Sequence, residues 1–139
     1  MLLDATIVIP TFNHADFLPY ALRSALAQDG VTIEVFVVGD GVGDDTRAAL
    51  EPFLQADERV RFFDLPKGER HGERHRHEAL REASGEAVCY LGDDDILLPE
   101  HVSEMLKPNP LVTYDRAFEA RGASRTPPEG QAGLCRRRC

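Results

Sequence analysis

Three consecutive carboxylates, Asp93, Asp94 and Asp95, are the residues of this sequence best suited to chemistry. They follow an apolar run over residues 87–91 that has the pattern of a buried strand. Adjacent carboxylates repel one another, and a bound divalent cation removes that repulsion because it carries the opposite charge. The triple therefore predicts a metal site at a strand end. The alternative is a solvated acidic turn that caps the helix expected around Pro99.

A second acidic turn, Gly39-Asp40-Gly41, follows the apolar run over residues 32–38. Its glycines suggest a dinucleotide-binding fingerprint, but Gly43 stands at the wrong spacing for the third glycine of that motif. The turn after the first expected strand, where the fingerprint belongs, has no glycine. The glycine-rich lysine motif of P-loop nucleotide hydrolases is absent as well, which excludes that class.

Three histidines, His71, His75 and His77, stand among alternating charges. His71 and His75 are four positions apart, so they share one face of a helix and could form a zinc pair. The sequence offers no obvious third ligand and no metalloprotease helix motif. We therefore favour a solvated helix for this stretch.

Four apolar runs, at residues 5–9, 32–38, 59–63 and 87–91, predict the strands that position these turns. The first, with no alternation of polar residues, is typical of a strand buried on both faces. Helices are expected over residues 17–26, with Asp16 as the cap, and around residues 48–54. A third helix, on the surface, is expected to end at Gly85, and a fourth is expected to have Pro99 in its first turn. This alternation predicts an α/β domain with a mainly parallel sheet.

Ligands of open parallel sheets bind at the carboxyl ends of the strands. Those ends are residues 10–13, 39–41 and 92–95, and we expect them to form one site.

The chain has 139 residues and a net charge of -8 that is unevenly distributed. Residues 116–139 contain six arginines and two glutamates, a local balance of +4, which leaves -12 on residues 1–115. An acidic body disfavours nucleic acid as a partner and suits divalent cations. The apolar runs are much shorter than the ~20 residues of a transmembrane helix. Asp4 stands where a signal peptide has a basic flank, and we expect a cytoplasmic protein.

The expected domain covers residues 1–115, with a weak fifth strand at residues 111–114. Residues 116–139 are rich in arginine, glycine and proline, and we expect a disordered basic tail. Such a tail could bind acidic lipids or a partner, which leaves peripheral membrane association open. The three cysteines are too few for a disulfide framework, and Cys89 is expected to be a buried small side chain.

Four short blocks stand in order along the chain: Ile7-Val8-Ile9-Pro10-Thr11-Phe12-Asn13, Val37-Val38-Gly39-Asp40-Gly41, Ala83-Ser84-Gly85-Glu86, and Tyr90-Leu91-Gly92-Asp93-Asp94-Asp95-Ile96 with Leu98-Pro99-Glu100-His101. Together they resemble the family 2 glycosyltransferases of the GT-A fold, from about residue 5 to residue 115. The resemblance implies a Rossmann-like, mainly parallel sheet with helices on both faces. It also implies inverting transfer of a sugar from a nucleoside diphosphate sugar, with a UDP-sugar favoured, to an unknown acceptor. A Mn or Mg ion would hold the diphosphate.

The resemblance also implies roles for five residues in binding the nucleotide sugar. Pro10 and Thr11 resemble the wall of the nucleotide pocket, and Asp40 looks like the acid that hydrogen-bonds the base. Asp93 is similar in place to the residue near the ribose, and Arg76 to a residue that contacts the diphosphate.

For the metal, the resemblance implies Asp94 as the main ligand and Asp95 as a second one. Simple strand alternation would instead put Asp93 and Asp95 on one side, and this alternative stays open if the strand continues past residue 91. Gly39 and Gly92 stand where many family members have an Asp, so the DxD-like motif is a variant.

The resemblance identifies no catalytic residue in this chain. Domains of the family usually continue well beyond this length, and the general base is expected in that further part, so we expect the domain to be incomplete at its carboxyl end. A non-catalytic nucleotide-binding or interaction module of the same fold is the alternative function. A phosphatase that uses Asp93 and Asp95 as nucleophile and acid ranks last, because that motif normally follows the first strand of its fold, and here it follows the fourth.

Overall fold

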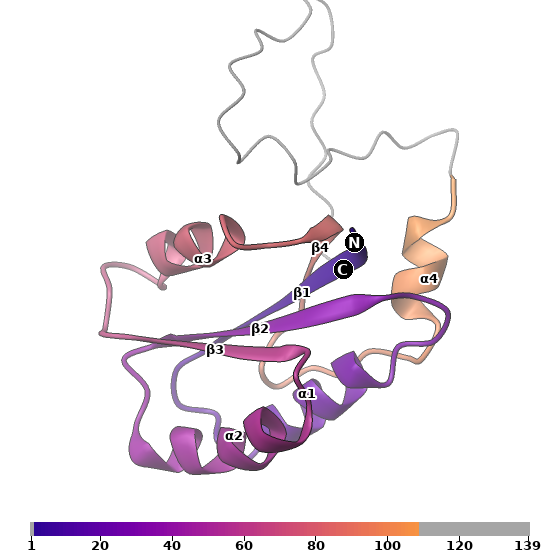
Figure 1. Cartoon of the computed structure of the whole chain (residues 1–139). Coiled ribbons are helices and arrows are strands. Elements are labelled where there is room, and N and C mark those ends of the chain that lie inside the picture. Colours follow the sequence, from indigo (N-terminus) through magenta and orange to yellow (C-terminus); the bar gives the residue numbers. More distant parts are fainter. Residues whose placement is uncertain (1, 109–139) are drawn as a thin grey trace, which may run out of the picture.

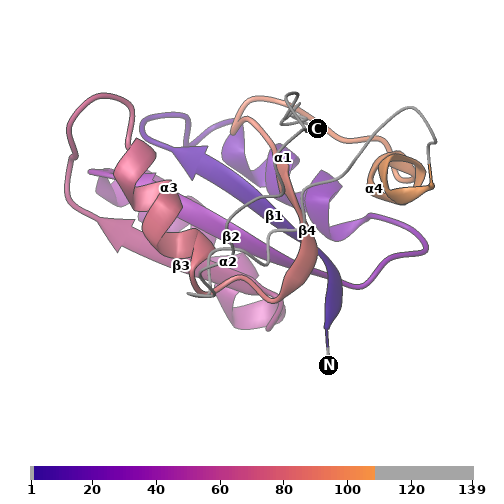
Figure 2. The same cartoon turned by 90° about the horizontal axis from the view of Figure 1, so that it is seen from above.

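A computed structural model describes residues 2–108 of the chain (Figures 1 and 2). Within this range strands and helices alternate as β1 (Leu3–Thr11), α1 (Leu18–Leu26), β2 (Ile33–Asp40), α2 (Asp44–Ala56), β3 (Val60–Leu65), α3 (Glu73–Leu80), β4 (Gly85–Tyr90) and α4 (His101–Leu106). The expected α/β alternation is confirmed. The fifth strand expected at residues 111–114, the domain boundary at residue 115 and the tail over residues 116–139 lie outside the described residues.

The described strands form one parallel sheet in the order β3-β2-β1-β4. β1 is central: Ile7 lies opposite Val35 of β2 on one side and opposite Cys89 of β4 on the other. The chain winds outward from β1 to β3 and then returns to place β4 on the other side of β1. The winding direction therefore reverses between β1 and β4, and at such a point the loops that follow the two strands diverge and leave a crevice.

Helices cover both faces of the sheet, as expected. α1 and α2 lie on one face of the sheet and α3 lies on the other (Figure 1). Leu22 of α1, Leu50 of α2 and Val102 of α4 belong to the larger apolar cluster. On the α3 face Val8 and Phe36 contact Ala79 in a smaller cluster. Cys89 is 2% exposed within the larger cluster, which confirms it as a buried small side chain.

β1 extends through Pro10 to Thr11, whereas the sequence suggested an end at Pro10. Val8 and Pro10 direct their backbone groups to the same side of the strand, toward β4. Pairing with β4 ends at Val8, whose carbonyl accepts the N–H of Leu91 at 3.0 Å. Because the pairing stops there, the missing N–H of Pro10 breaks no hydrogen bond between strands.

Three predicted helix boundaries were wrong. Asp16 does not cap α1, which begins after Phe17 without a side-chain cap, because the carbonyl of His14 accepts the N–H groups of both Phe17 and Leu18. Pro99 precedes α4, and its carbonyl accepts the N–H of Asp29 at 2.8 Å outside the helix.

The third wrong boundary is Gly85, which begins β4 and does not end α3. A Cβ at this position would lie 2.3 Å from the backbone nitrogen of Thr6, so glycine lets β4 approach β1 closely.

No helix within residues 2–108 is long and apolar enough to cross a membrane.

Candidate nucleotide-sugar site

A pocket of about 220 Å³ opens at the carboxyl ends of the strands. Its lining includes the five residues that the sequence suggested for the nucleotide sugar: Pro10, Thr11, Asp40, Arg76 and Asp93. They come from the ends of β1, β2 and β4 and from α3. As expected, the three strand ends lie side by side and line one pocket. The pocket wall also contains Phe12, from the expected strand end, and residues that the sequence did not single out as candidates: His14, Lys67 and Gly72.

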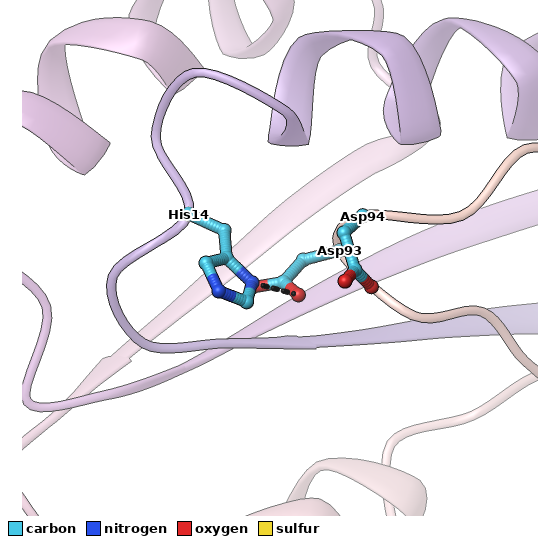
Figure 3. Close-up of side chains that lie close together, drawn as sticks. All are labelled: His14, Asp93 and Asp94. Carbon is cyan, nitrogen blue, oxygen red and sulfur yellow. Dashed lines mark hydrogen bonds and ion pairs between the residues drawn. The ribbon is translucent and has the colours of Figure 1, made fainter.

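His14 and Asp93 join the loops after β1 and β4 across the crevice. His14 Nδ1 lies 2.8 Å from Asp93 Oδ1, and Figure 3 shows the two side chains pointing toward each other. The side chain of Asp93 is 12% exposed, whereas that of His14 is 44% exposed. The hydrogen bond to Asp93, and then its negative charge, raise the pKa of His14 above its usual value.

His14, Asp93 and Asp94 bring one potential ligand atom each within 4.8 Å of one another (Figure 3). This is the three-residue group with metal-ligand geometry among residues 2–108, and Asp95 is not part of it. Sequence reasoning did not propose His14 as a ligand. The one available signal was its place in the loop directly after β1, the same strand end that supplies Pro10 and Thr11.

Gly92 shapes the acidic turn. The N–H of Asp95 bonds the carbonyl of Gly92 at 3.1 Å, so the chain folds back on itself here. A Cβ on Gly92 would lie 2.6 Å from Asp95 Oδ2 and 3.2 Å from Asp94 Oδ1. Glycine at this position therefore leaves room for the two exposed carboxylates.

α1 fixes the segment that follows the acidic turn. Gln28, which is 7% exposed, donates from Nε2 to the carbonyl of Leu98 at 2.7 Å and accepts the N–H of Val102 at 2.8 Å. Gln28 lies just beyond the end of α1, and within the helix Ser24 Oγ accepts the N–H of Leu97 at 3.1 Å. These bonds hold the segment after the aspartates against a rigid helix.

Asp40, at the end of β2, lies among several donors. Lys67 Nζ bonds its Oδ2, the N–H of Gly68 donates to its Oδ1 at 2.6 Å, and His75 Nε2 lies 3.6 Å from Oδ1. Burial acts to raise the pKa of Asp40, but the hydrogen bonds from Gly68 and Lys67 and the nearby charges outweigh it and hold this pKa below its usual value. Asp40 is therefore an ionised acceptor inside the pocket.

Two glycines allow the loop between β3 and α3 to close over Asp40. Gly41 has φ +72°, and a Cβ there would lie 2.8 Å from the Cβ of Lys67. Gly72 has φ +69°, and a Cβ there would lie 3.1 Å from the carboxyl carbon of Asp40. Both positions need the left-handed conformation that glycine adopts without strain.

The expectation of a solvated helix for the histidines was wrong for two of them. His71 precedes α3, which begins at Glu73, and His75 has a side chain that is 13% exposed and packed beside Asp40. His75 Nε2 also lies 2.7 Å from the carbonyl of Pro66. His77 is exposed, as expected. Arg76 is held in place because its Nη1 donates to the carbonyl of His71 at 2.6 Å.

The model of Glycosyl transferase family 2 matches residues 6–109. The chain belongs to this family. The match covers β1 from residue 6 onward, the other three described strands and the strand ends that line the pocket, so the fold is that of the GT-A-like family members. Membership decides against the phosphatase alternative.

Curated relatives agree with this family assignment. The chain is 32% identical over 103 residues to the GalNAc(5)-diNAcBac-PP-undecaprenol beta-1,3-glucosyltransferase of Campylobacter jejuni, covering 73% of this chain and 33% of that protein. It is 36% identical over 104 residues to the succinoglycan biosynthesis protein ExoO of Rhizobium meliloti, covering 75% of this chain and 29% of that protein. The chain thus spans about a third of the length of these relatives.

Solved structures of two similar proteins show the same fold. TarS of S. aureus, residues 1–349, in complex with UDP-GlcNAc, is 26% identical with a TM-score of 0.65, covering 73% of this chain and 30% of that chain. A mannosyltransferase from Pyrobaculum calidifontis, in complex with GDP-Man and Mn2+, is 27% identical with a TM-score of 0.56, covering 69% of this chain and 29% of that chain.

Proposed function

We propose that this chain binds a nucleoside diphosphate sugar in the strand-end pocket and forms the donor-binding part of a glycosyltransferase. The observation that carries the proposal is the convergence of Pro10, Thr11, Asp40, Arg76 and Asp93 on one pocket. These are the residues for which the family resemblance implies that role. Structurally similar proteins in complex with UDP-GlcNAc and GDP-Man support the ligand class.

The chemistry of the pocket fits such a ligand. Thr11 is 4% exposed, and its Oγ1 has no hydrogen-bond partner among residues 2–108, so a ligand that bonds this hydroxyl removes a cost of burial. Arg76 supplies a positive charge suited to a diphosphate, and Asp93 supplies an acceptor for the ribose hydroxyls. We assign recognition of the nucleobase to Asp40, the ionised carboxylate at the end of β2.

We also propose a Mn or Mg ion, with Asp94 as its main protein ligand and Asp95 as a second. Asp94 is exposed and belongs to the group whose ligand atoms lie within 4.8 Å of one another, and carboxylate oxygens are the donors that these hard cations prefer. The residues present therefore fit the ion. When bound, it neutralises charge that develops on the departing diphosphate. Mn2+ in the mannosyltransferase complex supports this choice of metal.

The reaction proposed for the whole enzyme is inverting transfer, in which an acceptor hydroxyl attacks the sugar carbon from the face opposite the diphosphate. None of the pocket residues named above is assigned the role of general base. The acceptor is left unspecified.

Calorimetric titration tests the proposal. Purified chain is titrated with UDP-GlcNAc and GDP-Man, each with Mn2+, with Mg2+ and with a chelator. Binding of at least one of these nucleotide sugars, tighter with metal, is the expected result. Absence of binding to any nucleoside diphosphate under all three conditions contradicts the proposal.

A non-catalytic nucleotide-binding module of the same fold is the second candidate, because the pocket residues named above bind the ligand and none of them is assigned as a general base. A chain of this kind would bind the nucleotide sugar but leave its glycosidic bond intact. An assay that monitors the release of free sugar or UDP from UDP-GlcNAc by chromatography distinguishes the two candidate functions. Turnover by the purified chain excludes a non-catalytic module.

A further inference from the structure

Lys67 makes two contacts in the pocket that the family assignment does not explain. Its Nζ bonds Asp40 Oδ2 and lies 4.4 Å from the centroid of the Phe12 ring. All three residues line the pocket, and they come from β2, from the loop after β1 and from the loop after β3. The ion pair and the contact with the aromatic ring together hold a normally flexible ammonium group in one place.

This arrangement puts a donor directly beside an acceptor. Asp40 accepts from Lys67 and from the N–H of Gly68, but a carboxylate has about four acceptor positions, so it has capacity left. The ammonium of Lys67 carries three donor hydrogens, and its side chain is 50% exposed. A ligand that enters the pocket therefore meets a carboxylate acceptor and an ammonium donor side by side, both already oriented.

We propose that Lys67 is a specificity-determining residue that, together with Asp40, selects uracil over cytosine. The proposal rests on the proposed function, in which Asp40 faces the base. Uracil presents its N3–H donor between two carbonyl acceptors. Uracil therefore matches a carboxylate that has one ammonium group beside it. Its N3–H donates to Asp40, and one of the two neighbouring carbonyls accepts from Lys67.

Cytosine does not match in the same position. Its N3 is an acceptor and would face the carboxylate of Asp40, and its amino group is a donor and would face the ammonium of Lys67. Both pairs are repulsive, and a polar group left unpaired in a binding site costs far more than a lost apolar contact. UDP is thus preferred over CDP, two ligands that differ only at this edge of the base.

The test compares the affinities for UDP and CDP in the same buffer with Mn2+, measured by calorimetry. Lys67→Met removes the donor, keeps much of the apolar stem, and is expected to lower the preference for UDP by about tenfold or more. Lys107→Met is the matched control, because it makes the same change in charge at the end of α4. It is expected to leave the preference unchanged. Thermal unfolding of each variant verifies that it folds.

Lys67→Gln is the second variant. It keeps a donor without the charge, and it is expected to lose part of the preference. A role of Lys67 at the diphosphate would lower the affinities for UDP and CDP by the same factor, and an unchanged ratio in either folded variant overturns the proposal. A wild-type chain that prefers CDP overturns it as well. Failure of the proposed function has a different signature, since the wild-type chain would then bind neither nucleotide.

Discussion

His14 Nδ1 lies 2.8 Å from Asp93 Oδ1, although the two residues are 79 positions apart in the sequence. The contact bridges the loops after β1 and β4 across the crevice, at the point where the winding of the sheet reverses. It also places an ionisable ring next to the acidic turn that carries the proposed metal ligands. The stability of this end of the sheet is therefore linked to pH.

The first prediction concerns that linkage. Asp93 raises the pKa of His14 above 6.5, so the pair stabilises the fold fully below pH 6.5, and this contribution disappears as the pH rises through the raised pKa. His14→Gln should be less stable than the wild type on the acidic side, and the difference should shrink as the pH rises. Urea midpoints between about pH 5.5 and pH 8.5, measured with a chelator present, check this. His77→Gln, at an exposed position of α3, is the control, and an equal pH-dependence of its difference from the wild type would contradict the assignment to His14.

The second prediction concerns the metal. Asp94→Ala should abolish metal-dependent nucleotide binding, while Asp95→Ala should weaken it less, because Mg or Mn normally takes only one or two protein carboxylates alongside phosphate oxygens. Removal of one carboxylate should also stabilise the fold slightly by relieving repulsion. Calorimetry with and without Mn2+ and a thermal melt of each variant measure the two effects. If Asp94→Ala loses stability and keeps its Mn-dependent binding, the acidic turn is structural.

The third prediction concerns recognition of the nucleobase. Asp40→Ala should weaken binding of the nucleoside by about 1.5–3 kcal/mol, because it removes a hydrogen bond to a charged group. The loss should be the same with metal and with chelator, since Asp40 is not in the group of potential metal ligands. Uridine and UDP titrations measure it. Asp16→Ala, at an exposed position that does not cap α1, should bind as the wild type does. A loss that appears only with metal would place Asp40 at the ion.

The fourth prediction concerns the loop over Asp40. Gly41→Ala should destabilise the fold, because alanine pays ~1–2 kcal/mol in the left-handed conformation and its Cβ would also lie 2.8 Å from the Cβ of Lys67. Gly30→Ala is the matched control, since Gly30 has φ +71° but its Cβ would meet only Ser103 at 4.0 Å. Urea unfolding should show a larger loss for Gly41→Ala, and UDP binding should fall in that variant alone. Equal losses in both would mean that close contact with Lys67 has no role.

Much of the fold was predictable from the sequence because its signals are local. Runs rich in β-branched residues, such as 5–9, have no alternation of polar residues, and this pattern is typical of a strand buried on both faces. The strands end within two residues of the ends of those runs, so the residue pattern alone was enough to propose Asp40 and Asp93 for one site. The errors fell at helix ends, where the carbonyl of His14 replaced a side-chain cap from Asp16.

The partners of those residues were decided only by the tertiary structure. The order β3-β2-β1-β4 sets which strand ends are adjacent, and no periodicity in the sequence encodes that order. It brings His14 to Asp93, and the close approach allowed at Gly41 and Gly72 brings Lys67 and His75 to Asp40. A sequence pattern reports which face of its own element a residue occupies, whereas a contact between side chains depends on how separate elements pack. For this reason the sequence by itself determined the strands and the acidic strand ends, and only the packing decided that a histidine and a lysine complete the pocket.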